Sequence, residues 1–584
     1  MKTRLVVYAN SDDALLLWAT DVLDDTVHGF AVQRRLEPAG GGASATSWLD
    51  NFAPPGPQPF QGGQHQPSNL WPFRSFTWTD HSVSRGGVVS YRVAPVLSDP
   101  ADPSKLRPPK LASASSWSKK RTIGAKSTTP YETYFNRGFV ISQFISRYLA
   151  AQFPGLAMEQ ALARFKDRIG KHDEDVIRAF LSGELRTTML RLLADARAQG
   201  DEVHAALYEL SDDELIKGLA ALKAHAHVVL ANGSIQAAKG EPAAEARKRD
   251  QNADGRAALV KAGVDVEQTH RFVSPGALAH NKFLVFSHAG IPERVWTGST
   301  NWTPTGLCTQ LNNGLLISDR AAATAYLAQW HALRDAHSSH PASLVNANAL
   351  PHPVGPAGHG DTVRFTRAPK KADLAELAAI VAGAGQGVLF LMFMPGGTGV
   401  LKNVRDLIQA RPALLVRGVV SDLPLGRKDE QTGTTTKVSV TLIDTAGEAT
   451  VPAATTYDVV QPGGMRHPAA GWAAEVTRQQ FKQGIGFAII HSKVLVVDPF
   501  GDDPVVVTGS HNFSPSASTG NDENFMVVRG DRALAEAYAV NVESAWRHYA
   551  ARVGNPFHNL SGIAYLRALQ QAQVREQVFW RLGS

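Results

Sequence analysis

Short apolar runs with alternating polar positions fill residues 1–105 of the chain, and breaks rich in glycine and proline separate them. The longest breaks cover residues 38–45 and 54–68. Such alternation places the apolar side chains on one face of a strand, and turn residues between strands favour hairpins. We therefore predict a small antiparallel β domain of sandwich type at the N-terminus. Its expected strands are Leu5–Ala9, Ala14–Ala19, Gly29–Arg34, Phe73–Thr79 and Val88–Val96.

From Tyr131 the spacing of apolar positions becomes helical, and strands and helices then alternate. A helix is expected over Leu185–Ala198, and strands are expected over Glu202–Leu210 and His227–Ala231. Between these strands, Ser211-Asp-Asp-Glu has the spacing of a capping box and predicts that another helix starts there. This alternation of strands and helices predicts an α/β layer architecture.

A segment rich in proline, glycine and histidine, residues 338–360, predicts a linker, and the same order of elements returns after it. We divide the chain into a β domain (1–108), a first α/β half (109–340), a linker (341–360) and a second α/β half (361–584). The elements expected in the second half are the strand Thr362–Thr366, the helix Asp373–Ala382, the strand Gly387–Phe393, the helix Leu401–Ala410 and the strand Leu414–Ser421.

The two halves are similar in sequence near their ends. Residues 280–313 align without a gap with residues 491–524, at a constant offset of 211 (491 minus 280), and 12 of the 34 positions are identical. Average composition would give roughly two or three identities. Many identical positions are polar, which favours a duplicated functional site over a duplicated core. These identities include His280/His491, Lys282/Lys493, Gly290/Gly501, Thr297/Thr508, Gly298/Gly509, Ser299/Ser510, Asn301/Asn512, Pro304/Pro515 and Asn313/Asn524.

The spacing of the shared polar residues has a chemical meaning. Histidine and lysine two positions apart on a strand point to one side of it, as do serine and asparagine two positions apart on the next strand. Neighbouring strands would then present a nucleophile or acid, a cation and two neutral polar groups at one place. This combination suits a tetrahedral phosphate, because its developing negative charge needs preorganised donors.

Composition narrows the class of protein but does not choose its partner. With 43% hydrophobic and 19% charged residues the chain is an ordinary globular protein, and its net charge of +6 favours anionic partners of any kind. The single cysteine, Cys308, excludes intramolecular disulfides and zinc sites made of several thiolates. Asp12 and Asp13 interrupt the apolar N-terminal run, so we expect no signal peptide and a cytoplasmic location.

The duplicated residues resemble the phospholipase D superfamily, whose signature is His-x-Lys, four residues, Asp, and then Gly-Ser-x-Asn. The second half fits this pattern with His491, Lys493, Asp498, Ser510 and Asn512. The first half departs from it, because Ser287 stands in place of the aspartate and Gln310-Leu-Asn312 replaces the later Asn-x-Glu segment that ends at Glu523 in the second half. The resemblance covers roughly residues 130–584.

The resemblance implies two pseudo-symmetric α/β halves that form one central active site, preceded by the all-β domain. It implies that His280 and His491 carry the catalysis together with Lys282 and Lys493, one histidine as nucleophile and the other as acid and base. Family precedent favours His280 as the nucleophile. The supporting and phosphate-binding residues would be Ser299, Asn301, Asn312, Ser510, Asn512, Glu523 and Asp498.

No metal and no cofactor is needed in this scheme, because lysines and asparagines carry the charge stabilisation. We group Glu523 with His491, and Asn312 with His280, since each follows its own histidine at the same distance. A carboxylate orients an imidazole and raises its basicity, whereas an amide only orients it. On this grouping the two histidines are chemically unequal.

Three functions follow from the sequence. The first is a phosphodiesterase that hydrolyses or transfers the head group of a phospholipid, acting as a monomer with transient contact to a membrane surface. The second is a metal-independent nuclease that uses the same chemistry. The third is a non-catalytic protein that binds phosphate or lipid with a decayed first half; retention of His280, Lys282, Ser299 and Asn301 argues against it.

Two further groups of residues have weaker signals. Asn136, Arg137 and Gln143 could line the entrance of the site, although an amphipathic packing helix is the simpler interpretation. His225 and His227 have the spacing of two residues on one strand face, but without a carboxylate or a third histidine nearby in the sequence we interpret them as a solvated helix end.

Overall fold

A computed structural model gives the structure of the chain. It describes residues 2–52, 64–102, 105–138, 152–171, 173–233, 241–242, 245, 248–267, 271, 277–393, 395, 398–421, 427–428, 435–436, 459–460, 490–553, 557 and 560–582. Gln143 lies outside these residues.

The N-terminal region is all-β, as predicted. Trp18, Phe30, Val32 and Tyr91 are buried in a core that the strands of its two larger sheets share, and this core also takes Leu566 from near the C-terminus. The strands form a three-stranded sheet, a four-stranded sheet and a small pair, in the orders β1 (Thr3–Ala9), β2 (Ala14–Thr20), β7 (Thr77–Asp80); β4 (Ala45–Trp48), β3 (Val27–Glu37), β8 (Val88–Leu97), β9 (Arg121–Thr122); and β5 (Asp50–Asn51), β6 (Gln66–Pro67).

Two larger mixed sheets follow, one in each half of the chain. The first has the order β10 (Tyr131–Phe135), β16 (Asn313–Ile317), β15 (Ile291–Gly298), β14 (Lys282–His288), β11 (Glu202–Leu207), β12 (Ala226–Leu230), β13 (Asp265–Val266). The second has the order β17 (His352–Pro353), β18 (Thr362–Phe365), β26 (Asn524–Arg529), β25 (Val505–Gly509), β24 (Val494–Val497), β19 (Gly387–Met392), β20 (Leu415–Val420), β23 (Val459–Val460). The strands β21 (Arg427–Lys428) and β22 (Thr435–Thr436) form a separate pair.

The two large sheets have the same topology once the edge strand β17 is set aside. In the first, β11 pairs in parallel with β12 and antiparallel with β14. In the second, β19 pairs in parallel with β20 and antiparallel with β24. The duplication predicted from residues 280–313 and 491–524 therefore extends through the whole α/β part of each half, which confirms the predicted α/β fold class.

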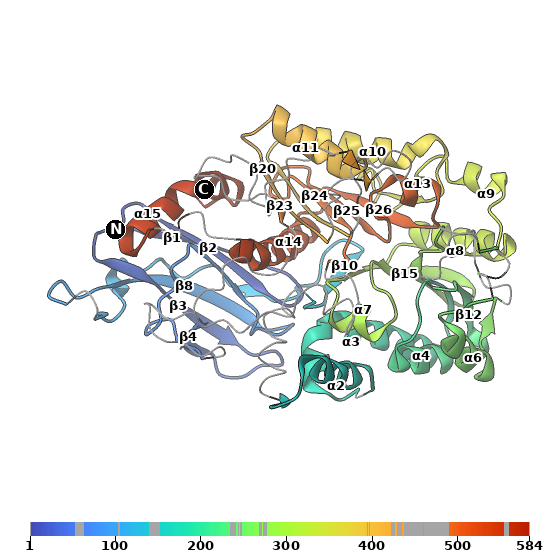
Figure 1. Cartoon of the computed structure of the whole chain (residues 1–584), viewed down its shortest axis with the longest axis horizontal. Helices are drawn as coiled ribbons and strands as arrows, with labels where there is room; N and C mark the ends of the chain where they lie inside the picture. Colours follow the sequence, from blue (N-terminus) through green and yellow to red (C-terminus); the bar gives the residue numbers. More distant parts are fainter. Residues whose placement is uncertain are drawn as a thin grey trace.

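Helices cover both faces of each sheet, which explains why the strands are almost continuously apolar. In β14, Phe283 and Val285 lie in the core shared by the two sheets, whereas Leu284 and Phe286 lie under the outer helices. Figure 1 shows the outer helices on opposite sides of the molecule, with two long helices between the sheets. The outer helices are α2 (Met158–Lys171), α3 (Val176–Gln199), α4 (Asp213–Ala220) and α6 (Ala253–Lys261) on the first sheet, and α10 (Ala372–Ala382) and α11 (Val400–Ala410) on the second. The helices between the sheets are α8 (Arg320–Asp335) and α14 (Arg532–Val553).

The remaining helices are short or lie near the C-terminus. Among the described helices, none has the length and apolar character needed to cross a membrane. These remaining helices are α7 (Pro304–Cys308), α9 (Ala342–Ala347), α13 (Pro515–Thr519), α15 (Gly562–Ala572), α16 (Val574–Phe579) and the 3-10 turns η1 (Leu111–Ser113), η2 (Lys223–His225) and η3 (Pro369–Lys371).

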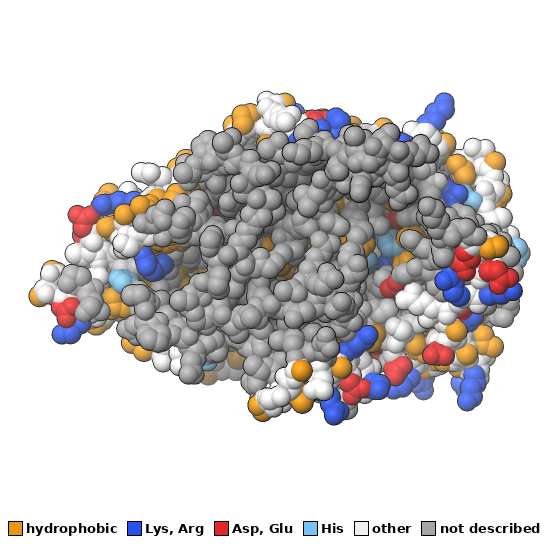
Figure 2. All heavy atoms as spheres, in the orientation of Figure 1, with side chains coloured by type: hydrophobic (Ala, Val, Ile, Leu, Met, Phe, Trp, Pro, Cys, Tyr) orange, Lys and Arg blue, Asp and Glu red, His pale blue; other side chains and the backbone are white. Residues whose placement is uncertain are grey.

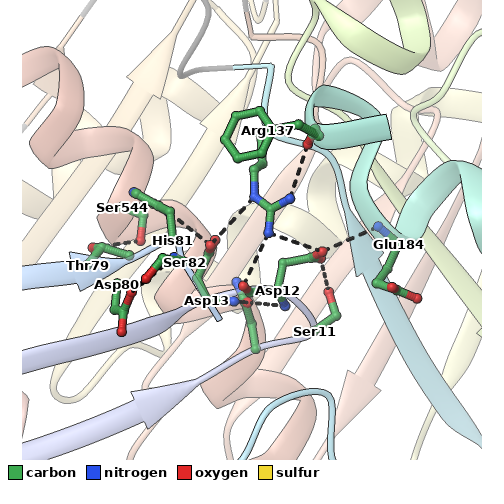
Figure 3. A network of polar contacts seen from close by, with 12 residues as sticks. Ser11, Asp12, Asp13, Thr79, Asp80, His81, Ser82, Arg137, Glu184 and Ser544 are labelled. Carbon is green, nitrogen blue, oxygen red and sulfur yellow. Dashed lines mark hydrogen bonds and ion pairs between the residues drawn. The ribbon is translucent and has the colours of Figure 1, made fainter. Parts of the chain in front are cut away.

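A buried ionic network joins the N-terminal strands to the first half. The guanidinium of Arg137 lies 3.7 Å from a carboxylate oxygen of Asp12 and 3.9 Å from one of Asp13, and His81 contacts Asp13 at 2.8 Å (Figure 3). Burial raises the pKa of Asp12 to about 6 although Arg137 opposes the rise. Arg137 stands two residues after the end of strand β10, and residues 136–138 form no helix, so Arg137 belongs to this junction rather than to a site entrance. The rest of the predicted packing helix lies outside the described residues.

Two local predictions also differ from the structure. The N-cap of α4 is Asp212, whose carboxylate accepts from the backbone N–H of Leu215. Ser211 stands one residue before this cap, and its N–H donates to the carbonyl of Trp302, as does the N–H of Asp212. The predicted linker at 341–360 contains helix α9 and strand β17, and β17 pairs with β18 and so extends the second sheet.

The cap residue Asp212 offers a stability test. Its carboxylate is fully buried and bonds to the guanidinium of Arg178 at 2.9 and 3.0 Å. Arg178→Met removes the cation and leaves a buried anion, so we expect the free energy of unfolding to fall by about 3–5 kcal/mol in urea denaturation followed by circular dichroism. The control is Arg191→Met, which removes an exposed pair with Asp195 and is expected to cost about 0.3–0.5 kcal/mol. Equal losses in the two variants would contradict the assignment.

Candidate functional site

The two His-x-Lys pairs meet at one buried place between the halves. His280 and Lys282 stand at the start of β14, and His491 and Lys493 stand directly before β24. The imidazole centroids of His280 and His491 are 6.2 Å apart and the rings are 67° from parallel. All four side chains are at most 4% exposed. The sequence prediction that the two pairs form one centre therefore agrees with their placement.

The two halves exchange backbone contacts around the histidines, and the exchange is symmetric. Ala279 forms a parallel bridge with Asp522, and its equivalent at the offset of 211, Ile490, forms the same bridge with Leu311. The N–H of His280 donates to the carbonyl of Asp522 at 2.9 Å, and the N–H of His491 donates to the carbonyl of Leu311 at 2.9 Å. The backbone beside each histidine is thus held by the other half of the chain.

This exchange crosses the side-chain partners as well. His280 Nδ1 lies 3.3 Å from Glu523 Oε2, and the Nδ1–H of His491 donates to Asn312 Oδ1 at 2.9 Å. Our grouping of Glu523 with His491, and of Asn312 with His280, is therefore wrong. The reason lies in the topology. Asn312 directly follows Leu311, and Glu523 directly follows Asp522, and both Leu311 and Asp522 form bridges to the opposite half.

Other duplicated polar residues connect the halves instead of facing the histidines. Thr297 Oγ1 donates to Asn524 Oδ1 at 2.8 Å, and the equivalent contact runs from Asn313 Nδ2 to Thr508 Oγ1 at 2.8 Å. These four residues are among the identities that we attributed to a site. Buried polar pairs across the interface fix the register of the two halves. This structural role is a second reason why these positions are identical in the two halves.

Burial and mutual repulsion dominate the electrostatics of the four basic groups. Burial, and then Lys282, lower the pKa of His280 to about 4, and burial lowers the pKa of Lys282 to about 7 although Glu523 and Glu209 raise it. Burial, followed by the charge of a neighbouring lysine, lowers the pKa values of His491 and Lys493 well below their usual ranges. A bound anion opposes this lowering of the pKa values, since an opposite charge favours the protonated forms. The site is therefore built to receive negative charge.

Each lysine is held by its own loop and by an aromatic ring. Lys282 Nζ donates to the carbonyl of His280 at 2.7 Å and lies 4.7 Å from the ring centroid of Tyr208. Lys493 Nζ donates to the carbonyl of His491 and lies 5.0 Å from the ring of Phe393. The contacts fix the ammonium groups beside the imidazoles.

The serines and asparagines of the signature have different contacts. Ser299 Oγ donates to Asn312 Oδ1 at 2.7 Å, and Ser510 Oγ accepts from the N–H of Asn524 at 3.1 Å, so both serines position the strand that follows. Asn301 Nδ2 donates to Glu209 Oε2 at 2.6 Å. The Oδ1 atoms of Asn301 and Asn512 are buried and have no hydrogen-bond partner among the described residues.

Asp498 is the signature residue that the structure places away from the histidines. It follows β24 at the end opposite Lys493, and its carboxylate accepts from the backbone N–H groups of Gly385, Gln386 and Gly387 at 2.6–2.8 Å. It therefore anchors the start of β19. Ser287 has the equivalent place at the far end of β14, so its departure from the signature leaves the surroundings of His280 unchanged.

Sequence reasoning missed three residues that line this place: Tyr208, Glu209 and Phe393. They stand immediately after β11 and β19, the equivalent strands of the two sheets. Ring centroids lie 4.7 Å apart for Tyr208 and His280, and 5.1 Å apart for Phe393 and His491. The sequence did offer a signal for these three residues, because they follow the ends of two equivalent strands, and α/β sheets bind their ligands at strand ends.

Comparison with known proteins bears on this arrangement. A family model described as "Cardiolipin synthase, PLD-like domain" matches residues 189–334 and 428–546, and these two regions contain both His-x-Lys pairs. The chain belongs to the phospholipase D superfamily. The description of the model names a phospholipid enzyme, while members of the superfamily include phosphodiesterases and phosphotransferases.

The solved structures that resemble this chain share little sequence with it. Phosphatidylserine synthase of Haemophilus influenzae Rd KW20 is 12% identical, with 68% of this chain and 92% of that chain covered and a TM-score of 0.38. Nuc of Salmonella typhimurium, a phospholipase D family member, is 16% identical, with 32% and 95% covered and a TM-score of 0.19. Yeast tyrosyl-DNA phosphodiesterase is 10% identical, with 57% and 84% covered and a TM-score of 0.32. No curated protein matches the chain in sequence.

The crossed pairing of histidines can be tested by titration. Because the negative charge of Glu523 raises the pKa of His280, Glu523→Gln is expected to lower that pKa below its value of about 4 and to leave His491 unchanged. The measurement is an NMR pH titration of protein with 13C-labelled histidine, in which His280→Asn and His491→Asn assign the two resonances.

Glu536→Gln is the matched control, because Glu536 is a half-buried carboxylate that accepts from the N–H of Ala9 outside the site. It is expected to shift neither histidine. A shift of the His491 resonance, with His280 unmoved, in Glu523→Gln would contradict the crossed pairing.

Proposed function

We propose that this chain cleaves phosphodiesters through a phosphohistidine intermediate, with His280 as nucleophile, His491 as general acid and base, and a phospholipid as substrate. The observation that carries the proposal is the buried group of two imidazoles and two ammonium groups that the two halves assemble at one point. Four basic groups with depressed pKa values need an anion, and a phosphodiester supplies one between the two rings.

The crossed partners support this division of roles. When Nε2 of His280 attacks phosphorus, positive charge develops on the ring, and the carboxylate of Glu523 beside Nδ1 stabilises it. Asn312 offers His491 only a neutral carbonyl oxygen, so protonated His491 gives up its proton readily. The correction to the pairing thus strengthens the choice of His280 over His491 as nucleophile.

The proposed reaction has two steps. In the first, a P–N bond forms to His280, the P–O bond to the leaving alkoxide breaks, and His491 protonates that alkoxide to an alcohol. In the second, His491 removes a proton from water, the resulting hydroxide attacks phosphorus, and the P–N bond breaks to release a phosphomonoester. An alcohol in place of water would give transfer of the phosphatidyl group instead of hydrolysis.

The lysines and asparagines stabilise the charge on the phosphoryl oxygens. Lys282 and Lys493 lie beside the two imidazoles, and a bound phosphate anion raises their pKa values back toward the charged form. Asn301 is oriented by Glu209, and Asn512 is its counterpart in the second half. We assign these four residues to phosphate binding, with Ser299 and Ser510 as supports of the strands.

The order of the two histidines can be tested with a substrate whose leaving group departs without a proton. With bis(p-nitrophenyl) phosphate, His491→Asn is expected to release one equivalent of nitrophenolate in a burst and to accumulate an acid-labile phosphohistidine, detected by 31P NMR and intact mass. His280→Asn is expected to give neither signal, and its turnover is expected to fall at least about 10³-fold.

His225→Asn is the control, since His225 lies at the exposed end of η2, and it is expected to keep full turnover. A burst from His280→Asn and none from His491→Asn would reverse the roles. A burst from both variants would exclude a single phosphohistidine.

A phospholipid is favoured over a nucleic acid by the description of the matching family model, which names cardiolipin synthase. On the described part of the face drawn in Figure 2, basic and acidic side chains lie interspersed, so this part of the surface favours neither substrate. We expect the purified chain to release choline or glycerol from vesicles of phosphatidylcholine or phosphatidylglycerol, and to leave a fluorescent single-stranded oligonucleotide intact at the same enzyme concentration.

Matched reactions with His280→Asn separate this activity from contamination. Oligonucleotide cleavage that falls steeply with salt, without alcohol release from either vesicle, would contradict the lipid assignment and favour the nuclease. Wild-type binding of vesicles without turnover of any of the three substrates would favour the binding protein.

A further inference from the structure

A second cluster of histidine and carboxylate side chains lies in the first half, away from His280 and His491. We propose that Glu202, His204 and His227 bind a divalent transition metal ion of the zinc class. These residues stand near the starting ends of β11 and β12, whereas the site described above lies beyond the other end of β11. This proposal is independent of the phosphodiesterase assignment.

The strand geometry brings the three side chains together. His204 and His227 are register partners on parallel neighbouring strands, with ring centroids 4.6 Å apart, and Glu202 lies two positions before His204 and therefore on the same face. One carboxylate oxygen of Glu202 and one nitrogen of each imidazole lie within 4.8 Å of one another. Tetrahedral zinc needs ligand atoms about 3.4 Å apart. The planes of the two imidazoles lie 17° from parallel, so the ring of His227 as well as the exposed Glu202 side chain must turn to direct their ligand atoms at one ion.

The environment of His204 is not explained by packing alone. Its side chain is 7% exposed, and Nδ1 is buried without a hydrogen-bond partner in the part of the chain that the structure describes. An unsatisfied buried nitrogen is costly, and a metal ion would satisfy it.

The surroundings of His227 match a metal-bound histidine. Its Nδ1–H donates to Asp265 Oδ2 at 2.9 Å, which leaves Nε2 as the ligand atom, and Arg334 holds Asp265 through two bonds of 2.6 and 3.0 Å. A carboxylate behind the imidazole is the usual means of orienting a metal ligand. His331 is exposed on α8, and its ring centroid lies 5.8 Å from that of His204.

The sequence argument against a metal at His227 fails for a structural reason. It required a carboxylate or a third histidine close in the sequence. The fold supplies Glu202 and His204 from the neighbouring strand, and the parallel pairing of β11 with β12 sets them beside His227.

The experiment uses the untagged full chain, stripped with EDTA and dialysed against buffered zinc. We expect inductively coupled plasma mass spectrometry to find one zinc per chain, isothermal titration calorimetry to give a single site, and cobalt to produce the visible absorption of a tetrahedral centre. Glu202→Gln and His227→Gln are each expected to weaken zinc binding at least about tenfold, and Asp265→Asn about 10–100-fold.

His225→Gln is the matched control, because it removes an exposed histidine two positions from His227, and it is expected to retain wild-type affinity. His280→Asn is also expected to bind zinc normally, and Glu202→Gln is expected to keep the phosphodiesterase turnover of the wild type. The proposal is overturned if wild-type protein binds no more zinc than the Glu202→Gln/His227→Gln double variant, or if His225→Gln loses as much affinity as His227→Gln.

Discussion

The exchange of short segments between the two halves is the constraint on which the site depends. Leu311 and Asp522 each bridge to the residue that precedes a histidine of the opposite half. These bridges fix the backbone of both histidines and, one residue further on, deliver Asn312 and Glu523 to the opposite imidazoles. Neither half can therefore form a complete imidazole environment alone, although each carries its own His-x-Lys pair.

The same exchange explains how the protein tolerates a buried group of basic side chains. Taking charges out of water is unfavourable unless partners compensate, and here most of the compensation for His280, Lys282 and Lys493 comes from Glu523 and Glu209 together with backbone carbonyls. Burial, and after it the repulsion between the basic groups, still holds their pKa values below the usual ranges. The large core between the halves offsets this cost, since apolar side chains of both sheets, α8 and α14 pack there in one cluster.

The sequence predicted much of this because its signals were local or repeated. Alternation and helical spacing located most strands and helices, and the constant offset of 211 predicted the doubled topology. The resemblance to the phospholipase D superfamily implied the meeting of His280 with His491. It failed where an answer depended on contacts between distant segments. The partner of Glu523 and the carboxylate near His227 are both set by pairing between strands, which spacing along one chain does not reveal.

Duplication followed by divergence gives the crossed arrangement its chemical meaning. If Glu523 served the histidine of its own half, the fuller signature of the second half would also hold the better nucleophile, and the first half would be the weaker partner. Because the segments cross, the carboxylate of the second half serves His280, and the amide of the first half serves His491. The change at Ser287 lies at the far end of β14 and does not weaken His280. A departure from the family signature in one half is therefore compatible with a complete site, since the histidine of each half takes its side-chain partner from the other half.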